Sequence, residues 1–266
     1  IVALGSYYHN SNAGHIRVYQ YSSSDVSWNQ LGSDIDGEAD DKSGSSISLS
    51  DDGTILAIGG TGPNSNTGHV RVYEYSSSDV SWNQLGADID GEAEGDRFGS
   101  PLSLSSDGTI LAITSTRVNN NTGHVRVYKY SSSDVSWNQL GSDIDGETES
   151  DYFGNSLSLS TDGTTVAIGS HYNDGPNGTD SNIGLVRVYQ YSSSDVSWNQ
   201  LGSDIYGEEP NSNDQSGYSI SLNSDGTILG VVARGNAVNG YSGLLRVYQY
   251  SNSSWSQLGS DIDADA

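Results

Sequence analysis

Acidic side chains gather in one short segment of a repeating sequence, and their spacing suits metal binding. The segment recurs as "DIDGEAD" (34–40), "DIDGEAEGD" (88–96) and "DIDGETESD" (143–151). Calcium takes six to eight oxygen ligands, several of them carboxylates, so these segments could supply a calcium site. The alternative interpretation is a solvated acidic turn without a metal. The candidate calcium ligands are Asp88, Asp90, Glu92, Asp96, Asp143, Asp145, Glu147 and Asp151.

Residues that could catalyse a reaction form no recognisable set. Three of the five histidines, His15, His69 and His124, occupy one position of the repeat, which is typical of a structural residue. The chain has no cysteine, so it has no thiol nucleophile and no zinc–thiolate site. No glycine-rich phosphate loop precedes a helix. We therefore predict that the protein is not an enzyme.

One arginine in each repeat lies between apolar residues in the middle of a predicted strand. A partly buried guanidinium group needs an anionic partner. The first aspartate of the "DID" segment, one strand away, is the natural candidate. We predict five ion pairs, which are Arg17–Asp34, Arg71–Asp88, Arg126–Asp143, Arg187–Asp204 and Arg246–Asp261.

The charge balance limits the partners that this surface can bind. The chain carries 34 acidic residues against 10 basic ones, a formal net charge of −24. Phosphate binding needs clustered Lys and Arg, so nucleic acid and anionic membrane surfaces are poor partners. No apolar run approaches the roughly 18 residues of a membrane span, so we expect no membrane insertion. Cations, cationic surfaces and neutral glycans remain open as ligands.

Tryptophan spacing reveals an internal repeat. The five tryptophans lie 54, 55, 61 and 57 residues apart, a period that indicates a propeller or a solenoid. Each repeat holds short segments rich in β-branched and aromatic residues, and an Asp-Gly pair joins the first two as a hairpin. No segment combines helix caps with a 3.6-residue period, so we expect essentially no helix. In the second repeat the four segments are 43–50, 54–60, 68–76 and 81–90.

Four antiparallel strands, repeated around an axis, describe the blade of a β-propeller. We predict an all-β fold, a single five-bladed β-propeller domain over 1–266, with a solenoid of stacked hairpins as the rival. The first blade lacks its first strand, and the sequence begins within a predicted strand, so we expect a piece of a longer protein. The predicted blades are approximately 1–42, 43–96, 97–151, 152–214 and 215–266.

The segment "GDRFGSPLSLSSDGTILAIT" (95–114), together with the strands that follow it, resembles the FG-GAP repeat, the blade unit of integrin-α-like propellers. Phe-Gly pairs stand at 98–99 and 153–154, while the Gly-Ala-Pro position is degenerate, as in "IGG" at 58–60. The resemblance implies a propeller that binds other molecules, and in this family a loop Asp-x-Asp-x-Asp-Gly often holds calcium. Here the matching loops, such as "LSDDGT", share only the aspartate beside glycine, so the usual calcium site of the family is lost.

The loops between the second and third segments vary most, and recognition residues favour such loops. These loops span 7–13, 61–67, 116–122, 171–183 and 234–242. Asn120, Asn177 and Asn252 each begin an Asn-x-Ser/Thr glycosylation sequon, which is usable only in a secreted eukaryotic protein. The candidate ligand-binding residues are Tyr7, Tyr8, His9, Arg117, His171, Tyr172, Arg234 and Tyr241.

These observations together predict a non-enzymatic binding or adhesion module, extracellular or on the cell surface. Its partner would be a glycan or a protein ligand, recognised by the variable loops on one rim of the propeller. The alternatives are a purely structural repeat within a larger surface protein and, third, a propeller-type hydrolase or lyase. The "SWNQLG" sequence is nearly identical from repeat to repeat, which favours a structural role for that segment.

Overall fold

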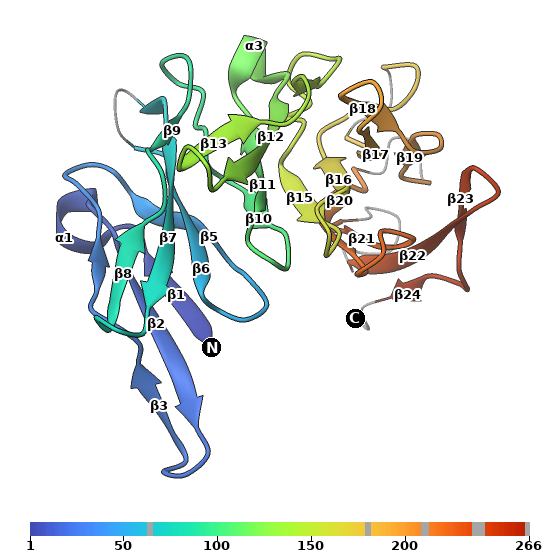
Figure 1. The fold of residues 1–266 in the computed structure, drawn as a ribbon. Helices are drawn as coiled ribbons and strands as arrows, with labels where there is room; N and C mark the ends of the chain where they lie inside the picture. Colours follow the sequence, from blue (N-terminus) through green and yellow to red (C-terminus); the bar gives the residue numbers. More distant parts are fainter. Residues whose placement is uncertain (63–65, 179–181, 209–212, 236–242, 264–266) are drawn as a thin grey trace. The chain divides into compact units, whose positions relative to one another are not determined.

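A computed structural model describes residues 1–62, 66–178, 182–208, 213–235 and 243–263 (Figure 1). The chain divides into two compact units. The first unit comprises residues 1–115 and 127–139, and the second comprises residues 116–126 and 140–266. The prediction of a single domain stays a prediction.

Five antiparallel sheets follow one another along the chain, which confirms the all-β class and the five repeats. The first sheet holds β1 (Val2–Ser6), β2 (His15–Ser22), β3 (Ser27–Gln30) and β4 (Ile35–Asp36). The second holds β5 (Ser43–Leu49), β6 (Ile55–Gly60), β7 (His69–Ser76), β8 (Ser81–Gln84) and β9 (Ile89–Asp90). The third holds β10 (Leu102–Leu104), β11 (Ile110–Ser115), β12 (His124–Ser131), β13 (Ser136–Gln139) and β14 (Ile144–Asp145).

The last two sheets repeat this order. The fourth sheet holds β15 (Ser156–Leu159), β16 (Thr165–Ser170), β17 (Leu185–Ser192), β18 (Ser197–Gln200) and β19 (Ile205–Tyr206). The fifth holds β20 (Ser216–Leu222), β21 (Ile228–Ala233), β22 (Leu244–Ser251), β23 (Ser254–Gln257) and β24 (Ile262–Asp263). The first sheet lacks the strand equivalent to β5, as predicted.

The outer segment of each repeat forms two short strands rather than the predicted one. In the second sheet β8 and β9 both pair with β7, as Tyr73↔Gln84 and Val70↔Ile89. The chain bends away from the ladder between them, over residues 85–88, and this bend carries Asp88 beside Arg71. The irregular stretch therefore positions one half of each ion pair.

Only short helical turns occur among the described residues, in agreement with the expectation of essentially no helix. They include α1 (His9–Asn12) and α3 (Val118–Asn121), each with three consecutive residues of positive φ, over 10–12 and 119–121. Both lie in variable loops rich in asparagine, which tolerates the left-handed region better than most residues. They are single turns that connect strands, so the all-β class is unaffected.

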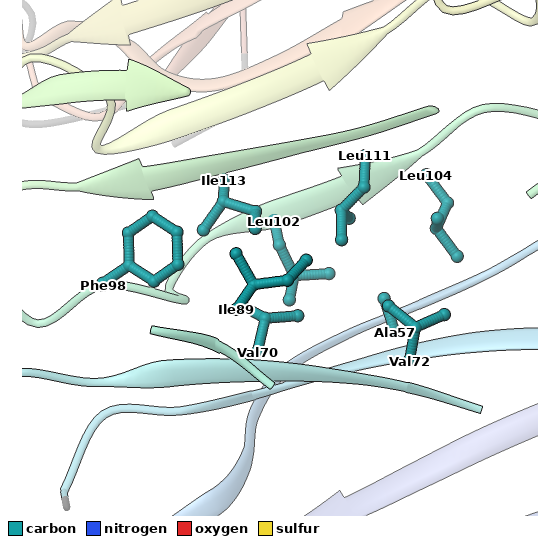
Figure 2. Close-up of a cluster of buried hydrophobic side chains, with 9 residues drawn as sticks. All are labelled: Ala57, Val70, Val72, Ile89, Phe98, Leu102, Leu104, Leu111 and Ile113. Carbon is teal, nitrogen blue, oxygen red and sulfur yellow. The ribbon is translucent and has the colours of Figure 1, made fainter. Parts of the chain in front are cut away.

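The core lies between facing sheets. In the first unit, Val70, Val72 and Ile89 of the second sheet point toward Leu111 and Ile113 of the third (Figure 2). Alternation along each strand sends these apolar residues to one face. Equivalent residues form the clusters between the first and second sheets and between the fourth and fifth. Each repeat therefore buries its apolar residues against its neighbours rather than within itself.

Candidate functional site

The five predicted arginine–aspartate pairs are all present. Arg126 donates from Nε and Nη2 to Asp143, and Arg187 donates from Nε and Nη2 to Asp204, at 2.8–3.0 Å. Arg17 and Arg246 contact Asp34 and Asp261 through the same two nitrogens. Arg71 contacts Asp88 through Nε at 2.9 Å, while its Nη1 and Nη2 contact Asp41 and Glu38. Each arginine enters from the third strand of its sheet, and each aspartate enters from the bend in the outer segment. These pairs occupy Asp88 and Asp143, two of the candidate calcium ligands.

Two histidines lie beside acidic segments, although their recurrence in the sequence had indicated only a structural role. His69 lies opposite Asp90 in the strand register, and His124 lies opposite Asp145. With Asp88 and Asp143 they form two groups, His69–Asp88–Asp90 and His124–Asp143–Asp145, whose ligand atoms lie within 4.8 Å of one another. The sequence could have indicated this contact, because the "GH" and "DID" motifs lie in segments of the repeat that form paired strands.

A buried aspartate closes the acidic loop between repeats. Asp96 accepts a hydrogen bond from the backbone N–H of Ala93 at 2.9 Å, and Asp41 does the same for Glu38 at 3.2 Å. Asp151 and Asp214 occupy the same loop position, and all four side chains are buried. The other candidates, Glu92 and Glu147, have exposed side chains at the loop surface. The structure thus distributes the eight candidates among ion pairs, histidine clusters, loop closure and the exposed loop surface.

A cavity of about 110 Å³ lies in the second unit, at the acidic loop that enters the fourth sheet. Asp151, Asn173 and Arg187 supply its principal polar groups, and Glu147 and Tyr206 also line it. Phe153 and Leu185 provide apolar wall. The side chains of Asp151, Asn173 and Arg187 are buried, so their charges and dipoles act with little screening by water.

Burial raises the pKa of the Asp151 carboxyl above its usual value, although hydrogen bonds from Asn173 and Thr148 and the charge of Arg187 oppose this shift. Asn173 donates to Oδ2 of Asp151 and in turn accepts from the backbone N–H of Gly175, which fixes the amide. Ser170 donates to the backbone carbonyl of Asp151 at 2.7 Å. The carboxyl is therefore held in one position, and its proton affinity is increased, as in a general base or acid.

Arg187 forms the positive wall of the cavity. It bridges Glu147 and Asp204, with Nη2 at 2.8 Å from a carboxylate oxygen of each. Tyr206 donates its hydroxyl to Asp204 at 2.9 Å, and burial followed by this carboxylate raises the pKa of Tyr206 to about 12. The two carboxylates outweigh the single guanidinium charge, so the cavity has no net positive charge to attract a strongly anionic ligand.

Aromatic rings line up beside this loop in the same unit. Tyr152 contacts Tyr172, Tyr172 contacts His171, and His171 contacts Tyr218, with ring centroids 5.4, 4.1 and 5.3 Å apart. The guanidinium of Arg234 lies 5.1 Å from the ring centre of Tyr218. We call these five residues the tyrosine shelf. His171, Tyr172 and Arg234 were candidate ligand residues, whereas Tyr152 and Tyr218 were not, because neither lies in a predicted variable loop.

The described candidate ligand residues outside the tyrosine shelf are Tyr7, Tyr8, His9 and Arg117. Tyr7 and Tyr8 are exposed and contact each other, with ring centroids 4.2 Å apart. His9 contacts His15 across the first loop. Arg117 is exposed at the start of α3. Tyr241 lies outside the described residues.

A family comparison identifies the repeat. Residues 143–189 match the model of the FG-GAP repeat, which confirms the resemblance. The match covers β14 of the third sheet and β15, β16 and most of β17 of the fourth, including the cavity residues from Glu147 to Arg187. No curated protein sequence matches the chain.

Solved structures share the fold at low sequence identity. One is a protein of Bacteroides uniformis, provisionally described as a 6-phosphogluconolactonase, with a TM-score of 0.65 and 14% identity over 99% of this chain and 67% of that one. Another is the periplasmic gluconolactonase of Pseudomonas aeruginosa, with a TM-score of 0.62 and 18% identity over 99% and 68%. A Bacteroides fragilis protein, provisionally described like the first, has a TM-score of 0.58 and 14% identity over 96% and 67%.

These structures correct two predictions. The first is the non-enzymatic adhesion module, which was inferred from the binding roles of proteins with similar repeats. The second is that the chain is not an enzyme, which was inferred from the lack of a recognisable catalytic motif. These three solved structures are described as lactonases, which are enzymes, so both expectations are wrong. At this identity the likeness establishes the fold alone, and activity must be argued from the site. Within the described part of the chain, no helix is long and apolar enough to cross a membrane.

Proposed function

We propose that this chain forms the propeller of a hydrolase that opens a small, uncharged, sugar-derived ester, with a lactone as the substrate class. The observation that carries the proposal is the buried Asp151 carboxyl in a polar cavity, with a raised pKa and a fixed orientation. The five sheets would be blades of one propeller. The likeness to lactonases supports the reaction class, and the periplasmic gluconolactonase supports a location outside the cytoplasm.

Asp151 would act as the general base in this reaction. A water molecule beside its carboxylate would lose a proton to Asp151 while its oxygen attacks the ester carbon. Negative charge then develops on the carbonyl oxygen, and the guanidinium of Arg187 supplies the nearest fixed positive charge in the cavity. Proton return from Asp151 to the departing alkoxide completes ring opening. Asn173 would be a positioning residue, because it acts through the Asp151 carboxylate.

Charge argues for an uncharged ester rather than a phosphorylated one. Glu147 and Asp204 already neutralise Arg187, and the whole chain carries a formal net charge of −24. A phosphate group would need unpaired Lys or Arg, which this cavity does not offer among the residues that line it. The partly exposed rings of Tyr172 and Tyr218 provide flat surfaces on which a neutral sugar ring can stack.

The two histidine–aspartate clusters have no part in this reaction. Each pairs one imidazole nitrogen with two carboxylates, a donor set that suits transition metals better than calcium, which prefers oxygen ligands alone. One carboxylate of each cluster also binds an arginine, whose charge opposes a bound cation. We propose a structural role for both clusters and test calcium directly, as described in the Discussion.

Hydrolysis of glucono-lactone tests the proposal. Proton release is followed at constant pH, with the spontaneous rate subtracted, for the wild type, Asp151→Asn and Asp96→Asn. Asp96 is the matched control, because it closes the equivalent loop before the third sheet and lies outside the cavity. We expect Asp151→Asn to lose roughly 10²- to 10⁴-fold in kcat/KM, while Asp96→Asn keeps its activity.

Two results would contradict the proposal. The first is a wild-type rate no higher than the spontaneous rate for a panel of neutral five- and six-membered sugar lactones. The second is equal loss in Asp151→Asn and Asp96→Asn, which would mean that both residues act through the fold. The wild-type kcat/KM should also fall in acid as Asp151 protonates, at a pH above the usual range of an aspartate.

A further inference from the structure

The cavity at Asp151 is too small to hold a whole sugar derivative. Its volume is about 110 Å³, whereas pockets that enclose a small molecule usually measure roughly 300–1,000 Å³. The ester carbonyl and the attacking water molecule suffice to fill it. The rest of the substrate must therefore lie outside the cavity, on the surface next to its lining residues.

The tyrosine shelf begins one residue away from the lining of this cavity, and both belong to the second unit. Tyr152 stands between Asp151 and Phe153, which both line the cavity. Tyr172 precedes Asn173, the residue that donates to the Asp151 carboxylate. The rings of Tyr152 and Tyr172 contact each other, with centroids 5.4 Å apart. Consecutive Cα atoms lie about 3.8 Å apart, so a ligand of two sugar rings can span from the cavity to the shelf.

Tyr152 occupies a position at which the fold does not require an aromatic residue. It has left-handed backbone, with φ +54°, and donates its N–H to the carbonyl of Asn121 at 2.9 Å. The residue after the buried loop aspartate has φ of 54–55° and donates to an asparagine carbonyl in three other repeats, where it is Lys42, Arg97 or Gln215. The loop conformation is therefore independent of this side chain.

Tyr218 also occupies a position where other repeats have polar residues. Its N–H donates to the carbonyl of Gln215 at 3.2 Å. Asn155 makes the same hydrogen bond with Tyr152, and Ser45 makes it with Lys42. The aromatic rings at 152 and 218 thus form a surface that the fold by itself does not need.

Exposure and fixed spacing suit the shelf for stacking. Tyr172 is 37% exposed and Tyr218 is 42% exposed, whereas His171 is only 3% exposed. The His171 ring contacts both tyrosine rings, so it fixes their spacing. Burial, with the charge of Arg234, lowers the pKa of His171 to about 4, which keeps the imidazole neutral at neutral pH. The shelf therefore presents half-exposed aromatic faces with one charged group, Arg234, beside them.

These surfaces match the chemistry of a neutral sugar ring. The C–H side of such a ring packs on aromatic faces, while the hydroxyl groups at its edge form hydrogen bonds. Arg234 is exposed, with its guanidinium 5.1 Å from the ring centre of Tyr218, so its N–H groups can donate to hydroxyl oxygens at the edge. The formal net charge of −24 disfavours a strongly anionic ring in this place.

We propose that the tyrosine shelf is a subsite for a second sugar ring, and that the preferred substrate is a lactone that carries another neutral sugar. The lactone carbonyl enters the cavity at Asp151, and the second ring stacks on Tyr172 and Tyr218. This inference rests on the proposed hydrolase function and specifies the part of the substrate that the cavity cannot select. Contacts to a remote, non-reacting ring raise kcat/KM, because their binding energy holds the ester in place for attack.

Two lactones that differ by one sugar ring test the subsite. Cellobiono-lactone carries a glucose ring that glucono-lactone lacks, and proton release at constant pH gives kcat/KM for each after subtraction of its spontaneous rate. We expect the wild type to prefer cellobiono-lactone by roughly tenfold or more. Tyr172→Ala and Tyr218→Ala should each lower that preference by about threefold or more. Tyr172→Phe keeps the ring and should retain the preference.

Tyr8→Ala is the matched control for loss of an exposed ring. Tyr8 is the second residue after β1, as Tyr172 is the second residue after β16, and its ring contacts that of Tyr7. It belongs neither to the shelf nor to the residues that line the cavity. Tyr8→Ala should therefore keep the wild-type preference, and circular dichroism with thermal melting confirms that each variant is folded.

The outcomes separate the subsite from the hydrolase proposal. Equal kcat/KM for the two lactones in an active wild type would overturn the subsite and leave the hydrolase proposal standing. Equal loss of both activities in Tyr172→Ala would also overturn the subsite, since the residue would then act through the loop that holds Asn173. Absence of hydrolysis of either lactone would overturn the proposed function, and the substrate inference with it.

Discussion

Arg126 and Asp143 form a buried ion pair, with three hydrogen bonds of 2.8–3.0 Å between the guanidinium and the carboxylate. The Arg126 side chain is 7% exposed, whereas the equivalent Arg17 in the first sheet is 45% exposed with the same kind of partner. The same kind of ion pair therefore occurs once in a buried and once in an exposed environment.

Removal of the buried arginine should destabilise the protein strongly. Arg126→Leu leaves the charge of Asp143 without its partner, so we expect a loss of roughly 3–5 kcal/mol in the free energy of unfolding. Arg17→Leu should cost much less, because water replaces the lost contacts at an exposed site. Urea unfolding measures both. Equal losses would show that burial does not determine how much these pairs contribute to the free energy of unfolding.

Close backbone approach explains a glycine at the start of the third strand. Gly68 has φ +85°, and a Cβ there would lie 2.1 Å from the carbonyl oxygen of Phe98. Gly95 has φ +88° but nothing within 4 Å of a Cβ. Gly95→Ala should therefore cost about 1–2 kcal/mol from backbone strain alone.

Gly68→Ala should cost clearly more, about 3 kcal/mol or above, because the strand must also move away from Phe98. Thermal and urea unfolding of the two variants separate the steric effect from the backbone effect. Similar losses of unfolding free energy in both variants would indicate that the loop holding Phe98 moves aside at little energetic cost.

Repetition made most of the fold predictable from the sequence. Strand alternation and the "SDDG" turns recur at equivalent positions, so one correct interpretation applied to all five sheets. The aspartate beside glycine has a plain role: Asp52 accepts from the backbone N–H of Thr54 and the hydroxyl of Ser50. The arginine–aspartate pairs were predictable because a buried guanidinium needs an anion, and one acidic residue recurred at a fixed distance.

The candidate site was harder to predict, because its residues come from loops without a period. Asp151 has several acidic neighbours, and nothing in the order of residues shows that its side chain is buried while that of Glu147 is exposed. Its partner Asn173 lies 22 residues away, beyond two strands. Only the tertiary structure brings Asp151 and Asn173 together. For that reason no set of catalytic residues was recognisable in the sequence.

Buried His171 should make the stability depend on pH. Burial, with a further contribution from the charge of Arg234, lowers its pKa from 6.5 to about 4. Below pH 6.5 the unfolded chain binds a proton that the folded protein does not bind until about pH 4, so stability is lost as the pH falls through this window.

His171→Gln removes this proton uptake. We expect the wild type to lose more unfolding free energy than the variant between pH 7 and pH 4.5, by a difference on the order of 2 kcal/mol. Urea unfolding at both pH values gives the comparison, and carboxylate titration is common to the two proteins. Parallel losses would show that His171 is protonated in the folded state.

Calcium should leave the stability of the protein unchanged. Among the predicted ligands, Asp88 and Asp143 already bind Arg71 and Arg126, and Asp96 already accepts a backbone N–H of its loop. A cation would have to displace these partners and approach a guanidinium group. We expect the melting temperature in millimolar calcium to match that in EDTA within about 1 °C, with magnesium as the control for ionic strength. Calcium at 100 times its Kd would stabilise the fold by about 2.7 kcal/mol, a shift of several degrees. A rise of that size, absent in Asp90→Asn, would mean that the acidic segments do bind calcium and that the arginine pairs rearrange to admit it.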